Sequence, residues 1–202
     1  MYKIGLTGGI ASGKSTVVSM LRQYDAAIID CDIIARDVVL PGSKGLQAVV
    51  RAFGPQALLS DGTMNRAYIS SIVFTNPAKK QELEEILFPL IRQEIRTKIT
   101  QLEKAGEAVA FLDMPLLFEV KYQSYVNEVW LVYVDAVTQL ARLMARNGYT
   151  KDEALARIRS QFPIDKKRAL SQVIVDNTAS LEKTEEQVKA AWNQLLLRID
   201  KR

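Results

Sequence analysis

The chain has 202 residues, a formal charge of +4, one cysteine and no histidine. The length suits a single α/β domain with elaborations, and the composition excludes histidine-dependent catalysis, histidine-ligated metals and an intramolecular disulfide. The mild charge suits an anionic small ligand, and no Lys/Arg block is dense enough to argue for nucleic acid. Because no apolar run approaches transmembrane length, we expect no membrane partner and a cytoplasmic protein of undetermined oligomeric state.

The first predicted elements are an apolar strand over residues 2–7, a glycine-rich loop and a helix from Ser15 to Arg22. The loop, Gly8 to Ser15, matches G-x-x-x-x-G-K-[ST] and lies between a strand and a helix, which is the context that a phosphate-binding P-loop requires. A glycine-rich turn that binds nothing is the alternative interpretation. The motif therefore predicts a site for ATP.

The residue types of the loop fit this chemistry. We expect Gly8 and Gly13 to adopt positive φ angles and to let the backbone approach a ligand closely. Lys14 would place an ammonium on the β- and γ-phosphates, and the Ser15 hydroxyl would bind Mg²⁺.

A second strand is predicted over residues 26–30, and it ends in the sequence Asp30-Cys31-Asp32. Asp32 could orient an acceptor hydroxyl for in-line attack on the γ-phosphate, or it could merely cap the helix expected from Ile33. For Asp30 we expect contact with Mg²⁺-bound water or local support. Asp113 ends the third strand, over residues 108–113, and could hold metal-bound water.

Residues 41–106 form a predicted helical insertion between the second and third strands. Asn65 is a candidate helix cap, and Asn76 followed by Pro77 predicts the start of the longest helix. Pro89 lies in the middle of that helix and should kink or break it. An insertion at this edge of a parallel sheet is a natural subdomain for the acceptor substrate.

The last third of the chain contains predicted strands over residues 129–135 and 173–177 and a final helix from Ser180. Five apolar strands alternating with helices predict a three-layer α/β fold with a parallel sheet. Between these strands lie four arginines and the run from Lys166 to Arg168, which we interpret as a solvated or ligand-facing helix end. The arginines could form a mobile cover over phosphates or belong to two ordinary amphipathic helices: Arg142, Arg146, Arg157 and Arg159.

The reaction class follows by elimination. The guanine-reading Asn-Lys-x-Asp segment of regulatory GTPases is missing, and the chain is short for a motor ATPase. A compact kinase of a small hydroxyl substrate remains, with a non-catalytic nucleotide-dependent switch as the alternative from another class.

The chain resembles the dephospho-CoA kinases, which transfer the γ-phosphate of ATP to the ribose 3′-hydroxyl of dephospho-CoA in the last step of coenzyme A synthesis. The resemblance runs from the first strand to about Asn177. It rests on several segments in the family's order: Leu6 to Thr16, Ile29 to Arg36, Val39 to Gly42, Asp61 to Arg66, Ile72 to Phe74, Pro115 to Glu119 and Arg157 to Gln161.

The resemblance implies a fold like that of nucleoside monophosphate kinases: a core at about 1–40, 107–140 and 171–202, the insertion as the coenzyme-A-binding part, and a lid at about 141–170. It also implies residue roles, with Asp32 as catalytic base and Arg142 or Arg146 reaching the phosphates. The expected ATP-binding residues are Gly8, Gly9, Ala11, Ser12, Gly13, Lys14, Ser15, Thr16 and, near the adenine pocket, Asn177.

Three departures from the family pattern stand out. Cys31 replaces a small alanine, which we expect to be neutral. Phe88 stands where the family commonly has a histidine, and Ser171-Gln172 where acids often precede the last strand. We therefore assign no role to these positions.

Overall fold

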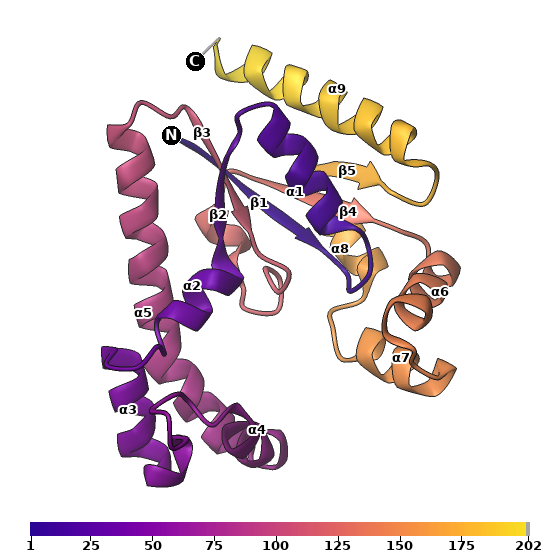
Figure 1. Ribbon diagram of the computed structural model, residues 1–202. Coiled ribbons are helices and arrows are strands. Elements are labelled where there is room, and N and C mark those ends of the chain that lie inside the picture. Colours follow the sequence, from indigo (N-terminus) through magenta and orange to yellow (C-terminus); the bar gives the residue numbers. More distant parts are fainter. Residues whose placement is uncertain (201–202) are drawn as a thin grey trace. The chain divides into compact units, whose positions relative to one another are not determined.

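The structure is a computed structural model, and it describes residues 1–200. Five strands form a parallel sheet, as predicted, and their order in the sheet is β2-β3-β1-β4-β5 (Figure 1). β1 is central and pairs with β3 on one side and β4 on the other. Nearly every residue of β3 and β4 is buried, as is typical of a parallel sheet covered on both faces. The strands are β1 (Tyr2–Gly8), β2 (Ala27–Asp30), β3 (Val109–Asp113), β4 (Glu128–Tyr133) and β5 (Val173–Asp176).

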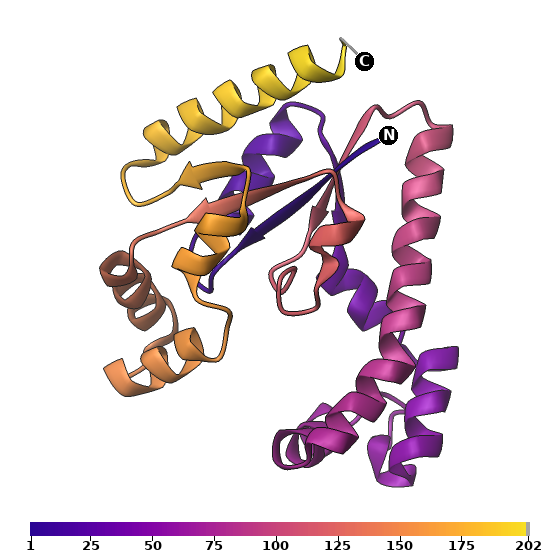
Figure 2. The same cartoon turned by 180° about the vertical axis from the view of Figure 1, so that it is seen from behind.

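The chain divides into two compact units. The first runs from Met1 to Ile29 and from Leu102 onward, and it contains most of the sheet. In this unit α1 and α8 lie on opposite faces of the sheet (Figures 1 and 2). Its helical elements are α1 (Lys14–Gln23), η2 (Tyr122–Tyr125), α6 (Ala136–Asn147), α7 (Lys151–Arg159), α8 (Ile164–Leu170) and α9 (Leu181–Ile199).

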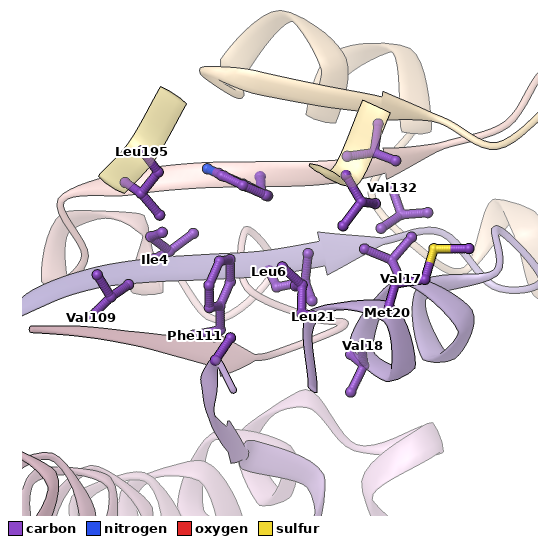
Figure 3. Packing of buried hydrophobic residues seen from close by; sticks show 14 residues of the cluster. Ile4, Leu6, Val17, Val18, Met20, Leu21, Val109, Phe111, Val132 and Leu195 are labelled. Carbon is purple, nitrogen blue, oxygen red and sulfur yellow. The ribbon is translucent and has the colours of Figure 1, made fainter. Parts of the chain in front are cut away.

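The main apolar core of the first unit lies between the sheet and the helices α1 and α9. Figure 3 shows Ile4 and Leu6 of β1 beside Phe111 of β3, with Val17 and Leu21 of α1 close to them. All five side chains are completely buried. This burial fixes α1, and with it the loop that precedes α1, to the central strand.

The second unit, Asp30–Gln101, is helical. Its own small core contains Val49, Phe53, Ala57 and Ile69. Its elements are α2 (Cys31–Asp37), α3 (Lys44–Phe53), η1 (Pro55–Ala57), α4 (Arg66–Thr75) and most of α5 (Pro77–Lys104).

Side-chain caps begin several helices where the sequence predicts them. The Asn65 side chain accepts a hydrogen bond from the Tyr68 N–H at the start of α4, and Asn76 accepts one from Lys79 at the start of α5. Ser180 caps α9 in the same way. Hydrogen bonds from Thr138 and Val137 hold the pKa of Asp135, the cap of α6, below its usual range.

Pro89 does not break the longest helix, because α5 continues unbroken from Pro77 to Lys104. A proline inside a helix removes one backbone donor, and it is a common position for a kink in a helix that continues beyond it. None of the helices in the described part of the chain has the length and apolarity needed to cross a membrane.

Candidate active site

The glycine-rich loop joins β1 to α1 in a conformation that requires special backbone angles. Gly13 is the cap residue of α1, with φ of 86°, and α1 begins at Lys14. Ala11 also has a positive φ, 60°, which is uncommon for a residue with a Cβ and carries a cost of about 1–2 kcal/mol. The loop therefore holds strained backbone next to the start of the helix.

The predicted positive φ is confirmed at Gly13 but is wrong for Gly8. Gly8 is needed for space. A Cβ at this position would come within 2.5 Å of the Ser12 Oγ and 3.1 Å of the Val132 carbonyl oxygen. The motif alone does not separate a glycine required for its backbone angle from one required for close packing.

A cavity of about 710 Å³ opens on the loop. It brings together, within the first unit, the loop from Gly8 to Ser15 and the arginines Arg142 and Arg146 of α6. Thr16, Asp113 and Asn177 are not among its lining residues. The lining is Gly8, Gly9, Ile10, Ala11, Ser12, Gly13, Lys14, Ser15, Pro115, Arg142, Ala145, Arg146 and Gln161.

The positive charge of this cavity and one buried hydroxyl without a hydrogen-bond partner among the described residues suit a phosphate ligand. Three cationic side chains line it, and no carboxylate does. The Ser12 Oγ is buried and has no hydrogen-bond partner within residues 1–200. A helix N-terminus preceded by a loop of backbone N–H groups favours an anion.

Lys14 makes an ion pair with Asp113 at the end of β3. Both side chains are largely buried, with 17% and 10% of their surfaces exposed. The carboxylate of Asp113 therefore lies at the end of the strand next to the loop, where it holds the loop's ammonium.

Asn177, just after β5, contacts the loop from outside the cavity. Its Nδ2 donates to the Ser12 carbonyl oxygen at 2.8 Å, and its Oδ1 accepts from the Thr184 hydroxyl at 2.9 Å. Its own carbonyl oxygen accepts from Arg142 Nη1 at 2.9 Å. Its side-chain amide is therefore engaged by protein atoms on both sides.

Two glutamines that the sequence analysis missed hold the tip of the loop. Gln139 Nε2 donates to the Ile10 carbonyl oxygen, and the Ile10 N–H donates to Gln161 Oε1, both at 2.8 Å. Gln139 is 2% exposed and lies one turn before the buried Leu143 of α6. The signal that could have identified Gln139 is a polar residue on the apolar face of a helix.

Lys167 is fully buried, contrary to the predicted solvated or ligand-facing run. Its Nζ lies 2.9 Å from a carboxylate oxygen of Glu119 and donates to the Pro115 carbonyl oxygen at 3.0 Å. Glu119 also accepts from the Phe162 N–H at 2.9 Å. A buried lysine needs such a partner, and this partner lies far away in the sequence.

Asp30 and Asp32 belong to the second unit, at the start of α2. The Asp30 carboxylate accepts from the Ile33 N–H at 2.9 Å, so Asp30, rather than Asp32, is the cap of this helix. Asp32 lies exposed in the first turn.

The sequence and the fold are similar to those of one family of known proteins. A profile of the family described as "Dephospho-CoA kinase" matches residues 2–183. The chain belongs to the dephospho-CoA kinase family. A dephospho-CoA kinase of Carboxydothermus hydrogenoformans is 51% identical over 185 residues, which are 92% of this chain and 90% of that protein.

Solved structures share the fold. A crystal structure from Thermus thermophilus has a TM-score of 0.83 and 32% identity, with 96% of this chain and 97% of that chain covered. The dephospho-CoA kinase of Campylobacter jejuni has a TM-score of 0.72 and 27% identity, with 96% of each chain covered. The protein is a dephospho-CoA kinase family member with a P-loop kinase fold, and this family uses ATP.

Proposed function

We propose that this protein transfers the γ-phosphate of ATP to the 3′-hydroxyl of dephospho-CoA, giving coenzyme A and ADP. The observation that carries the proposal is the cavity in which the phosphate loop meets Arg142 and Arg146, in a chain that belongs to this family. An enzyme catalyses phosphoryl transfer mainly by positioning the attacking and leaving oxygens and by stabilising charge on the phosphate.

The proposed roles are assigned residue by residue. Backbone N–H groups of the loop bind the phosphates, Lys14 exchanges its contact with Asp113 for a phosphate oxygen, and Arg142 and Arg146 offset charge in the transition state. Asp32 accepts the hydrogen bond of the 3′-hydroxyl and takes its proton as the O–P bond forms and ADP leaves. Asp32 is an exposed residue in the first turn of α2.

The donors at the loop suit Mg²⁺. Within residues 1–200 no group of three or more His, Cys, Asp or Glu side chains is placed to hold a metal. Mg²⁺ is usually held by one or two protein oxygens together with phosphates and waters, so Ser15 and Asp113 are sufficient, with Asp30 as a further candidate. When bound, Mg²⁺ would neutralise charge on the β- and γ-phosphates.

The test measures ADP release with Mg-ATP and a panel of acceptors: dephospho-CoA, nucleosides, nucleoside monophosphates and sugar acids. We expect stimulation by dephospho-CoA, with the product phosphorylated at the 3′ position. A stronger response to another acceptor would move the assignment to that substrate, and no response to any would favour a nucleotide-dependent switch.

Two variants test the proposed roles in the same assay. Lys14→Ala should abolish turnover, and Asp32→Asn should reduce kcat by about 100-fold or more while ATP binding is retained. Asp37→Asn, at the exposed end of the same helix α2, is the matched control and should behave as the wild type. Normal turnover of Asp32→Asn would remove Asp32 from the mechanism.

A further inference from the structure

Asn177 connects two parts of the active site, the phosphate loop and Arg142, to the edge of the sheet. Its N–H donates to the Tyr133 carbonyl oxygen at 2.8 Å, which continues the pairing of β4 with β5 by one residue. Its carbonyl oxygen binds Arg142, and its side chain binds Ser12. The residue is 6% exposed, and it therefore makes these contacts away from water.

The orientation of the Asn177 amide is fixed by a second residue. The Thr184 hydroxyl, in the first turn of α9, donates to the Asn177 Oδ1 at 2.9 Å and is fully buried. The hydroxyl also contacts the Ser180 carbonyl oxygen at 3.2 Å. With Oδ1 occupied in this way, Nδ2 is left to face the loop.

The contact with Ser12 sets the direction of a loop amide. The C=O and N–H of a trans peptide point in opposite directions, so holding the Ser12 carbonyl toward Asn177 turns the Gly13 N–H away from Asn177. Ser12 and Gly13 line the cavity, whereas Asn177 does not. The Asn177 side chain also leaves no room for a Cβ at Gly13.

From these contacts we infer that Asn177 is a positioning residue: it presets the Ser12–Gly13 peptide for a phosphate and anchors Arg142, and its side chain does not contact the base of the nucleotide. The inference deepens the proposed function and rests on it for the identity of the phosphate donor. It replaces our sequence-based expectation of a residue at the adenine pocket. Preorganised backbone donors are worth most where they need not reorient during the reaction.

The test compares Asn177→Ala with the wild type in binding of Mg-ATP, Mg-GTP and inorganic tripolyphosphate, together with kcat, KM and thermal unfolding. We expect ATP and tripolyphosphate to lose affinity by the same factor, about tenfold, with an unchanged preference between ATP and GTP. Asn193→Ala, on the exposed side of α9, is the matched control.

Two other outcomes would overturn the inference. If ATP binding weakens while tripolyphosphate binding does not, the amide contacts the base. If both affinities and kcat stay at wild-type values and only the unfolding temperature falls, the residue serves stability alone. Because the readout is binding, a protein that binds both ligands without phosphorylating dephospho-CoA would refute the proposed function and leave this inference standing.

A second variant keeps the test decisive if Asn177→Ala does not fold. Thr184→Val removes the hydroxyl that orients the amide, and that hydroxyl bonds Asn177 and Ser180 rather than the loop. The variant should therefore weaken ATP and tripolyphosphate by an equal, smaller factor of about threefold. Thr184→Ser should restore wild-type affinity. The double variant should bind no more weakly than Asn177→Ala alone, because the two residues act through one contact; independent effects would contradict the mechanism.

Discussion

The buried ion pair between Lys167 and Glu119 offers the clearest test of how the segment after α7 is held. Lys167→Met keeps an unbranched chain of similar length in the buried space but removes the ammonium. The variant leaves the Glu119 carboxylate without its cationic partner and the Pro115 carbonyl oxygen without this donor. Thr7 Oγ1 still donates to the same carbonyl oxygen.

The size of the effect follows from the burial of each partner. Breaking a fully buried pair by removing one member costs about 3–5 kcal/mol. Glu119 keeps 21% of its side-chain exposure and its hydrogen bond from Phe162, so we expect a lower value, about 2–3 kcal/mol. For a domain of this size that corresponds to a fall in Tm of about 4–12 °C.

The assay is thermal unfolding together with urea unfolding of matched variants. Lys166→Met changes the exposed neighbour in the same helix and should stay within about 0.5 kcal/mol of the wild type. Adding Glu119→Gln to Lys167→Met should recover part of the loss, because no unpaired charge remains. A Lys167→Met protein as stable as Lys166→Met would refute the reasoning.

Three further predictions concern stability and the loop. Burial opposes ionisation of Glu128, but hydrogen bonds from Arg198, Trp130 and Tyr2 outweigh this effect and lower the pKa of its carboxyl. The free energy of unfolding of the wild type should therefore exceed that of Glu128→Gln by its full amount above pH 4.5, and this difference should shrink as the pH falls through the lowered pKa. A difference that does not change with pH would contradict this. Ala11→Gly should raise the free energy of unfolding by up to about 1 kcal/mol in urea titrations, because it relieves the positive φ; a loss would show that the strain is not there. Gln161→Ala should weaken ATP binding about fivefold in titration calorimetry by freeing the Ile10 N–H, and unchanged affinity would remove Gln161 from the site.

Local features were predictable from the sequence because their causes are local. Asn65, Asn76 and Ser180 cap the helices that follow them, since a cap needs only a side-chain oxygen next to the first turn. The helix predicted from Ser15 begins one residue earlier, at Lys14. The five strands were recognisable from apolar runs, with shifts of one or two residues at their ends.

The contacts that hold the site were not predictable in the same way. Lys167 sits in a run of three cations, and only the fold shows that Glu119 is beside it. The pairing of Lys14 with Asp113 and the contact of Asn177 with Ser12 likewise join segments about a hundred or more residues apart. A side chain's partner across such a distance is set by the packing of strands and helices, which periodicity does not encode.

The central place of β1 has a consequence for how the protein is made. Tyr2 pairs with Val109 and Ile4 with Glu128, so β1 is translated before both of its neighbours and must wait for them. Nascent chains that stop before β4 expose one edge of this apolar strand, where chaperones or other unfinished chains can attach. We therefore expect nucleotide to protect translation intermediates from protease only after β5 and the residues that brace the loop have emerged.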